Sequence, residues 1–297
     1  MTKGFVTIAT GKETYFILAY NLLSSYRKFT KEPLPFAIIT DKENKYTRAF
    51  DKVIILENAT SSYMDKLEML SNPPFDYNIF IDADCLAYGD LNNLLVIKED
   101  WNGVMTFGET LPLDSDKGWF LYENLGNLQG KVKYCLKLHG GIIFFKKDIK
   151  TKQVYDTCKI IANNYYSYKF KMFIKPADEP ILALSMAING CKPIDTRGRD
   201  GACYFVFYPV AKKIKADISI PHLSYTINGK DWENNVLILH WQNINTQRPL
   251  YKREVDIIHH GRSIKNQIDY IIGIIKFNLI DFKHKTATQI YNFIHKK

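Results

Sequence analysis

Short apolar runs rich in β-branched and aromatic residues recur along the chain, with polar segments between them. Runs of about four to eight such residues are typical of strands buried inside a sheet. The predicted strands cover residues 5–10, 35–40, 52–56, 78–81, 103–107, 141–145 and 236–239.

Segments with apolar residues near helical spacing lie between these runs, and residues 198–202 are expected to form a loop. The predicted helices cover residues 13–28, 61–70, 151–164 and 180–188. The last one ends at Asn189-Gly190, a common helix stop signal. The alternation of strands and helices predicts an α/β fold with a mostly parallel central sheet flanked by helices.

The end of the chain has a different pattern. Apolar residues there fall on one helical face: Ile264, Ile268, Ile271, Ile275, Leu279 and Phe282. Four others widen that face: Ile272, Ile274, Phe277 and Ile280. Lys276 and Asp281 interrupt any run of the about 20 apolar residues that a membrane span needs.

We therefore predict an α/β domain over residues 1–255 and a basic amphipathic helical extension over residues 256–297. Residues 262–297 hold seven Lys or Arg and two Asp, and so carry five of the nine net positive charges. The extension is expected either to lie on an anionic membrane surface or to dock on the protein, in one chain or in a homodimer.

Composition narrows the class of protein. The 46% apolar and 24% charged residues are ordinary for a soluble globular chain. Five cysteines, never closely paired, indicate neither a disulfide framework nor a zinc site. A strand pattern begins at once with no signal-peptide core, so a cytoplasmic location is predicted. The basic residues follow no recognised nucleic-acid-binding motif, so nucleic acid is not predicted as a partner.

Candidate chemistry follows the run at residues 78–81, where Asp82 and Asp84 come directly after a predicted buried strand. Open α/β sheets bind ligands at this carboxyl end. Two carboxylates there suit Mg²⁺ or Mn²⁺ carrying substrate phosphates. The alternative is an Asp that caps the next turn beside a solvated neighbour. The chain has no glycine-rich phosphate loop, so a nucleotide would be held by metal and side chains.

Around Asp82-Ala83-Asp84, the order of elements over residues 1–250 resembles the GT-A glycosyltransferases, especially the family 8 group of glycogenin and lipopolysaccharide galactosyltransferases. The resemblance implies a GT-A fold and a metal site made of Asp82, Asp84 and His240. It also implies a donor site, which would comprise Ala9, Thr10, Tyr15, Lys66, Ala83, His139, Gly140, Gly141 and Arg248. Asp178 and Glu179 would lie beside the reacting sugar as the catalytic pair.

The chain departs from the family pattern at several of these positions. Thr10-Gly11-Lys12 stands where relatives often carry a carboxylate that reads uracil, which leaves the base open. His139 replaces an Asn, and Glu179 replaces a Gln. Arg248 matches the phosphate-binding Lys of the family only with a two-residue insertion.

Each residue also has a simpler interpretation. Lys66 could lie on a solvated helix face, Asp178 could be an N-cap and Glu179 could be exposed. The glycines could serve tight packing, and a His after an apolar strand is commonly a core residue.

The resemblance implies a metal-dependent hexosyltransferase that uses Mn²⁺ or Mg²⁺. It would move a sugar from a nucleotide-sugar, most simply UDP-linked, to a glycan or lipid-linked acceptor, with retention of configuration. Bacterial surface-polysaccharide synthesis on the inner face of the cytoplasmic membrane suits the basic tail.

Three alternatives stay open. One is a GT-A-shaped protein that binds nucleotide-sugar with weak or no turnover. Another is a haloacid-dehalogenase-type phosphatase, although its D-x-D continues with Gly-Thr and this one with Cys85-Leu86. The third is a metal-dependent nucleotidyltransferase, although the glycine-rich loop of that class is absent from this chain.

Overall fold

The structure is a computed structural model. It describes residues 1–96, 101–170, 175–195, 205–207, 212–220, 222–227, 229–233 and 237–295.

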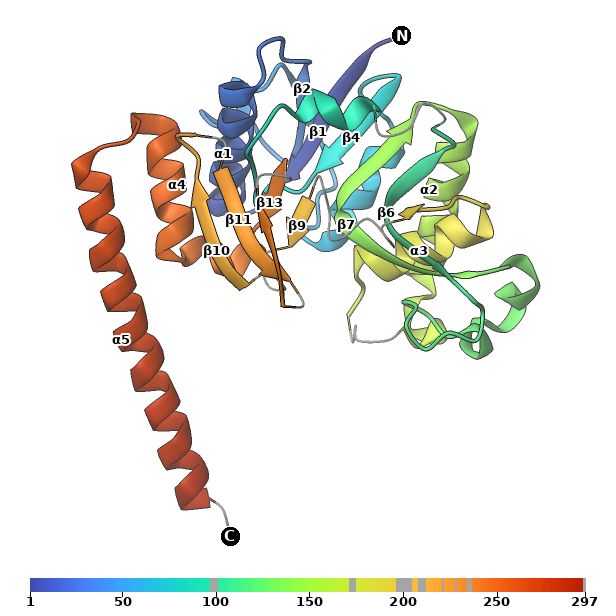
Figure 1. Ribbon diagram of the computed structural model, residues 1–297. Coiled ribbons are helices and arrows are strands. Elements are labelled where there is room, and N and C mark those ends of the chain that lie inside the picture. The colour runs from blue at the N-terminus through green and yellow to red at the C-terminus, as the bar shows by residue number, and fades with distance from the viewer. Residues whose placement is uncertain are drawn as a thin grey trace.

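A seven-stranded sheet forms the centre of the molecule (Figure 1). Its strands are β1 (Lys3–Ala9), β2 (Phe36–Thr40), β3 (Lys52–Ile55), β4 (Tyr77–Ile81), β6 (Val104–Leu111), β7 (Cys135–Lys146) and β8 (Ile194–Asp195). They lie in the order β3-β2-β1-β4-β7-β6-β8, and of these seven β7 runs antiparallel to its neighbours. The predicted α/β fold with a mostly parallel sheet is confirmed.

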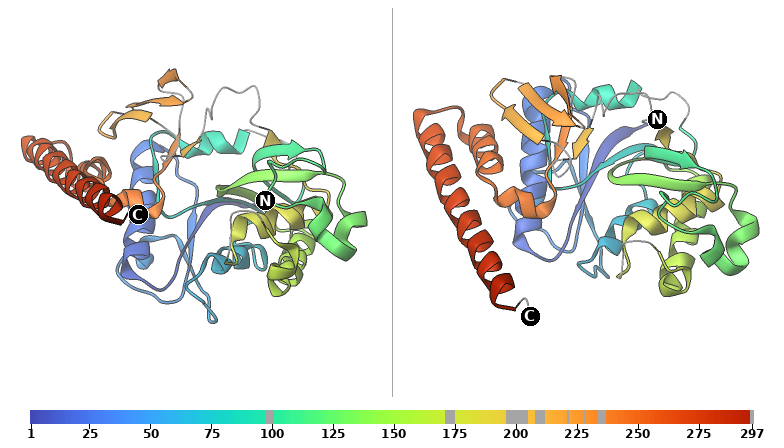
Figure 2. Two further views of the ribbon diagram at one scale, coloured as in Figure 1. Left: turned by 90° about the horizontal axis from the view of Figure 1, so that it is seen from below. Right: turned by 60° about the horizontal axis from the view of Figure 1, so that its bottom comes forward.

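Helices cover both faces of this sheet (Figures 1 and 2). The α-helices are α1 (Glu13–Phe29), α2 (Ile149–Asn163), α3 (Asp178–Ile188), α4 (Pro249–His260) and α5 (Ile264–His295). Shorter 3₁₀ segments are η1 (Thr47–Ala49), η2 (Tyr63–Leu70), η3 (Leu91–Val96), η4 (Tyr122–Lys131), η5 (Tyr165–Tyr168) and η6 (Asn243–Gln247). The helix expected over residues 61–70 is therefore η2.

Two apolar cores result, one on each face. Successive side chains of a strand point to opposite faces, so neighbouring residues of β1 join different cores. Phe5 lies in the cluster that contains Tyr26 of α1, whereas Val6 lies in the cluster that contains Val154 of α2 and Ile181 of α3.

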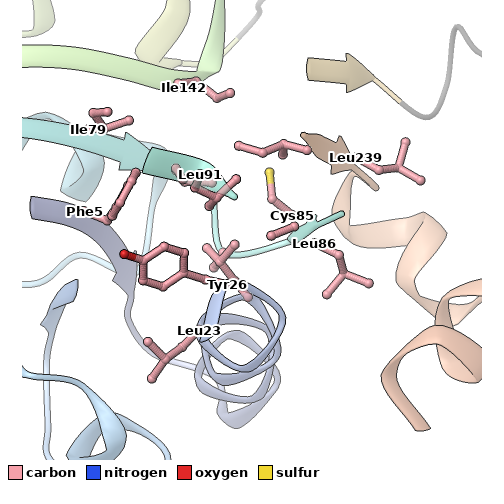
Figure 3. Packing of buried hydrophobic residues seen from close by; sticks show 14 of the residues in the cluster. Phe5, Leu23, Tyr26, Ile79, Cys85, Leu86, Leu91, Ile142 and Leu239 are labelled. Carbon is pink, nitrogen blue, oxygen red and sulfur yellow. The ribbon is translucent and has the colours of Figure 1, made fainter. Parts of the chain in front are cut away.

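Two small sheets accompany the central one. The first consists of β10 (Lys212–Asp217), β11 (His222–Ile227) and β12 (Lys230–Glu233). The second consists of β5 (Cys85–Ala87), β13 (Ile238–His240) and β9 (Phe205–Phe207), with β13 in the middle. In Figure 3, Cys85, Leu86 and Leu239 lie among the buried side chains that join β5 and β13 to α1 and β4. The loop expected at residues 198–202 lies outside the described residues.

The C-terminal helical extension is present, and α5 runs beside α4 away from the sheet (Figures 1 and 2). The predicted boundary between residues 255 and 256 falls inside α4. Docking uses one side of α5: the ring of Tyr270 lies 4.4 Å from the guanidinium of Arg253, and Gly273 lies against Pro249. Within the described part of the chain, none of the helices combines the length and the apolar character that a membrane span requires.

Candidate active site

Asp82 and Asp84 lie directly after β4, at the carboxyl edge of the sheet, as predicted. The backbone N–H of Asp82 donates to the carbonyl oxygen of Gly141 on β7 at 3.0 Å. The carbonyl oxygen of Asp84 accepts from the N–H of Trp241, just after β13, at 3.1 Å. Because β13 pairs with β5, with His240 opposite Cys85, a late segment of the chain meets this turn.

The structure places His240 beside both aspartates that were predicted as metal ligands. His240 Nε2 lies 2.9 Å from Asp84 Oδ1 and 3.7 Å from Asp82 Oδ2. Adjacent ligands held about 2.1 Å from an octahedral cation lie about 3 Å apart, so Asp84 and His240 have the spacing of two such ligands. Their oxygen and nitrogen donors suit Mn²⁺ or Mg²⁺. Burial alone would lower the pKa of His240, but the Asp84 carboxylate outweighs it and raises that pKa.

Cys85 is a neighbour that the sequence analysis did not assign. Possible ligand atoms of Asp84, Cys85 and His240 lie within 4.8 Å of one another, whereas Asp82 is outside this group. Burial raises the pKa of the Cys85 thiol well above its ordinary value, and the two aspartates raise it further. The thiol therefore stays protonated and packs with the core residues of β5.

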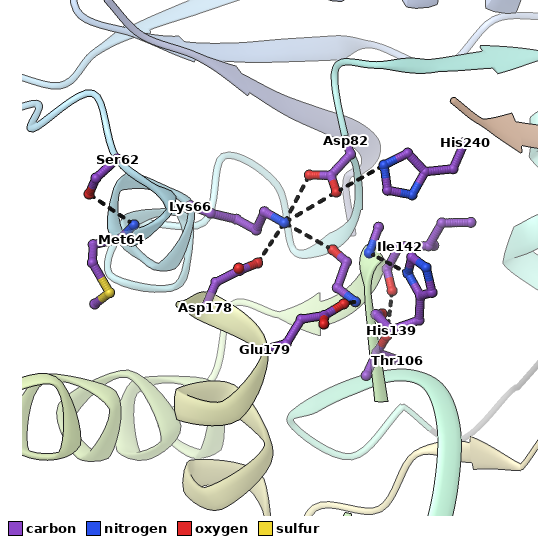
Figure 4. A network of polar contacts seen from close by, with 12 residues as sticks. Ser62, Met64, Lys66, Asp82, Thr106, His139, Ile142, Asp178, Glu179 and His240 are labelled. Carbon is purple, nitrogen blue, oxygen red and sulfur yellow. Dashed lines mark hydrogen bonds and ion pairs between the residues drawn. The ribbon is translucent and has the colours of Figure 1, made fainter. Parts of the chain in front are cut away.

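Asp82 instead forms an ion pair with Lys66, which projects from η2 (Figure 4). Lys66 Nζ lies 2.9 Å from Asp82 Oδ1 and 2.6 Å from Asp178 Oδ2, and donates to the carbonyl oxygen of Gly140 at 3.3 Å. Its side chain is 10% exposed, so the solvated-face interpretation of Lys66 is wrong.

Electrostatics keep this lysine charged. Burial would lower the pKa of Lys66, but Asp178 and Asp82 together raise it above the ordinary lysine value. One ammonium faces two carboxylates here. A deficit of positive charge therefore remains at the edge of the sheet.

Asp178 and Glu179 begin α3. The residue before them, Ala177, is the N-cap, and Asp178 faces Lys66, so the capping interpretation of Asp178 is not what the structure shows. Glu179 Oε1 accepts a hydrogen bond from the N–H of Gly140 at 2.7 Å. Burial, reinforced by Asp178, raises the pKa of Glu179 to about 7. Glu179 can therefore either hold or release a proton near neutral pH.

Gly140 lets α3 approach β7 this closely. A Cβ at position 140 would lie 3.0 Å from both Asp178 Oδ2 and Glu179 Cγ. The packing interpretation therefore holds for Gly140, and the absence of a side chain there lets Asp178 and Glu179 lie against β7.

His139 lies between this group and the metal ligands. Its Nδ1 accepts from the N–H of Gly141 at 3.1 Å, and its ring centroid is 5.4 Å from that of His240 (Figure 4). Burial lowers the pKa of His139 to about 3, with His240 adding to the effect. The ring is therefore neutral, and Nε2 carries the proton.

The predicted nucleotide-binding residues line the edge beside β1. Ala9 ends β1, and Ala83 lies buried in the turn between the two aspartates. Thr10 Oγ1 donates to Asp65 Oδ2 at 2.8 Å, and Tyr15 Oη accepts from Asn243 Nδ2 at 3.1 Å.

Asp65 is the buried anchor of this edge, and it was missed although it directly precedes Lys66. It also accepts from the backbone N–H groups of Thr60 and Ser61. The sequence carried no pairing signal for Asp65, since side chains at neighbouring positions of a helix do not face each other.

Arg248 lies at the junction of η6, α4 and α5. Its Nε donates to Asn245 Oδ1 at 2.8 Å, and its guanidinium lies 5.1 Å from the ring centroid of Phe277. Both partners belong to this junction rather than to the Lys66 group.

No known family of protein sequences matches the chain. No curated protein sequence matches it either. The solved structures that are similar to it include three glycosyltransferases. The galactosyltransferase LgtC, in complex with donor and acceptor sugar analogues, has a TM-score of 0.46 at 10% identity, over 69% of this chain and 75% of that one.

Two other glycosyltransferases match over a smaller share of their own length. The bifunctional glycosyltransferase WbbM has a TM-score of 0.44 at 13% identity, over 69% of this chain and 40% of its own. GlyE of Streptococcus pneumoniae has a TM-score of 0.41 at 10% identity, over 66% of this chain and 46% of its own. The match thus spans less than half the length of these two proteins.

Proposed function

We propose that the chain is a metal-dependent glycosyltransferase, a hexosyltransferase that takes its sugar from a nucleotide-sugar, most simply UDP-linked. The observation that carries this proposal is the convergence of Asp82, Asp84 and His240 at the carboxyl edge of the sheet, next to the charged Lys66. This is the edge where an α/β sheet binds its ligands.

Asp84 and His240 would hold the cation, Mn²⁺ or Mg²⁺, and Asp82 would share its carboxylate between that ion and Lys66. The bound ion supplies Lewis-acid stabilisation of a diphosphate leaving group. Lys66 contributes a fixed positive charge in a site with little water, where such charges act strongly.

Other residues of the chain position the substrate. Thr10 and Tyr15 flank the end of β1 on the nucleotide side, and neutral His139 lies next to Gly140 and Gly141 on the side of the donor sugar. Asp178 and Glu179 lie beside the reacting sugar in this proposal, and the protonation of Glu179 is balanced near pH 7.

The reaction breaks the bond between sugar C1 and the diphosphate oxygen, and joins C1 to an acceptor hydroxyl oxygen. The acceptor proton leaves with the diphosphate or through Glu179. The family resemblance implies retention at C1.

We further propose that α5 brings the site to a glycan or lipid-linked acceptor at the inner face of the cytoplasmic membrane. Apolar side chains of α5 are exposed on the side away from α4, with Ile268 at 50%, Ile271 at 56% and Ile275 at 55%. Lys265 and Lys276 on the same helix would add roughly 1 kcal/mol each on an anionic surface. This suits surface-polysaccharide synthesis by a peripheral enzyme.

The test is a screen of nucleotide-sugars for thermal stabilisation and for sugar release, with and without Mn²⁺. We expect a UDP-sugar to raise the unfolding temperature and to turn over only with the metal. Stabilisation without turnover on any acceptor or water would favour a nucleotide-sugar-binding protein. Release of phosphate from phosphomonoesters, with no effect of nucleotide-sugars, would favour the phosphatase.

A further inference from the structure

Strand β7 bulges where it faces the candidate site. Thr106 on β6 lies opposite Ile143 on β7. Two residues further along β6, Gly108 lies opposite Leu138. Residues 139–142 of β7 therefore stand opposite a single residue of β6. Bulges of this kind bend a strand and redirect its side chains, and they are common beside active sites.

The backbone of this bulge reaches several side chains of the site. The carbonyl oxygen of Gly140 accepts from Lys66 Nζ at 3.3 Å, and the N–H of Gly140 donates to Glu179 Oε1 at 2.7 Å. The N–H of Gly141 donates to His139 Nδ1 at 3.1 Å. A shift of the bulge would therefore move the hydrogen-bonding partners of the ammonium, the carboxyl group and the imidazole together.

The hydroxyl of Thr106 closes the neck of the bulge. Its Oγ1 lies 2.5 Å from the carbonyl oxygen of His139 and 2.7 Å from that of Ile142, the first and last residues of the bulge (Figure 4). A hydroxyl has one proton to donate, so the two carbonyls share it. One side chain of β6 thus binds both ends of the segment that faces the site.

Packing alone does not call for a hydroxyl at position 106. Thr106 is fully buried, and its neighbours on the same face of the sheet, Val104 and Ile143, belong to the apolar core. A valine would fill nearly the same volume there, but it would leave the two carbonyls without this donor. Thr7 on β1 gives the contrast, because its buried hydroxyl has no hydrogen-bond partner in the described part of the chain.

We propose that Thr106 is a positioning residue of the site, whose hydroxyl holds the bulge in the shape that places the backbone of Gly140 and the ring of His139. It acts through the bulge and not by contact with the substrate. Its effect on turnover rests on the proposed function, whereas the closure of the bulge does not. A misplacement of about 1 Å in an active site can cost about 100-fold in rate.

The first test measures amide hydrogen exchange by NMR in the full chain. We expect the N–H groups of Gly140 and Gly141 to exchange about tenfold or more faster in Thr106→Val, with most of the protection kept in Thr106→Ser. The amides of β4 report the stability of the sheet and should change much less. Thr7→Val is the matched control, since it also removes a buried hydroxyl from the central sheet. Thr106→Ser and Thr106→Ala differ only in the hydroxyl and repeat the comparison if Thr106→Val does not fold.

The second test measures UDP release from UDP-glucose and UDP-galactose with Mn²⁺. We expect kcat to fall about 10- to 100-fold in Thr106→Val, with KM changed less than about threefold. Thr106→Ser should recover most of the rate, and Thr7→Val should keep it. The Gly140 N–H lowers the pKa of Glu179, so weakening that hydrogen bond should also move the midpoint of the pH profile of kcat upward.

Equal exchange rates at Gly140 and Gly141 in Thr106→Val and Thr7→Val would overturn the closure of the bulge by Thr106. Faster exchange with an unchanged kcat and pH profile would overturn the positioning role and leave the glycosyltransferase standing. If the unmodified protein releases sugar from no nucleotide-sugar, the proposed function fails and the role in turnover fails with it. The exchange rates then still decide whether Thr106 holds the bulge.

Discussion

The sheet edge and the C-terminal helix depart from the usual distribution of residues in opposite directions. At the edge, Lys66, Asp82 and Asp178 are charged and largely buried. On α5, Ile264 and Ile275 are apolar and exposed, at 81% and 55%. Charged residues are rarely buried unless paired, and contiguous exposed apolar side chains commonly mark contact surfaces.

The two regions differ in whether other parts of the same chain supply contacts for their side chains. Each buried charge at the edge is paired with an opposite charge or a hydrogen-bonding group of another element of the same chain. These contacts offset the free-energy cost of removing the charge from water. The apolar side of α5 faces away from α4, its packing partner in the chain. The edge is therefore preorganised before any ligand arrives, whereas one side of α5 stays apolar and exposed.

The largest effect should come from breaking the buried charge group. Lys66→Met leaves Asp82 and Asp178 buried without their cation, and we expect it to lower the free energy of unfolding by about 3–5 kcal/mol. Urea denaturation in EDTA measures this. Lys152→Met is the control, since its ion pair with Asp156 is exposed and should contribute less than about 1 kcal/mol. Equal losses in the two variants would contradict the comparison.

Asp84→Asn tests the metal. It keeps the shape of the side chain and removes its charge, so we expect transfer to fall by about 10²–10³-fold while the protein stays folded. His240→Ala should weaken Mn²⁺ binding with a smaller loss of rate. The measurements are steady-state transfer against Mn²⁺ concentration and thermal unfolding. Near-normal, Mn²⁺-dependent transfer by Asp84→Asn would remove it from the site.

Glu179 gives a pH-dependent prediction. Its pKa is raised to about 7 by burial, so the unfolded chain loses this proton first and the protein loses stability as pH rises from about 4.5 to 7. Glu179→Gln removes this penalty and should be more stable than the unmodified protein by about 1–3 kcal/mol at pH 8. At pH 4 the difference should vanish. Parallel stability curves across this range would place Glu179 in solvent.

The smallest effect on folding should come from α5. Replacing Ile271 and Ile275 by Ser changes exposed side chains, so stability should shift by less than about 0.5 kcal/mol per residue. Sedimentation with anionic liposomes should nevertheless fall sharply, and binding by the unmodified chain should weaken with salt. Ile274→Ser, on the half-buried side, is the control. Unchanged pelleting would contradict the membrane role of these side chains. A shift from dimer to monomer would favour a second copy of the chain as the partner of α5.

Local patterns predicted much of the sheet. The strands from β1 to β4 and helix α1 appear within two residues of their expected ends, because their apolar runs are continuous and bounded by turn residues. The strands of three residues, β5, β9 and β13, were missed or displaced because long-range pairing, not composition, defines them. Helix α4 was missed for a related reason, since its few buried residues pack on α1.

The candidate site shows the same limit. Asp82 and Asp84 were visible from the sequence because they follow a buried strand. The ion pair of Lys66 with Asp178 joins η2 to α3, and no local pattern encodes it. The hydrogen bond from the Gly11 N–H to Asp41 likewise joins the ends of β1 and β2, and no local pattern encodes it.

The late position of His240 has a consequence for the order in which the protein is made. The last strand of the central sheet ends at Asp195, so a growing chain holds every element of that sheet before His240 has been synthesised. Asp82 and Asp84 exist at that stage, but β13 has yet to pair with β5 and deliver the histidine. Under the proposed function, the ability to retain a cation would therefore arise after the sheet itself, and metal retention would report completed C-terminal folding.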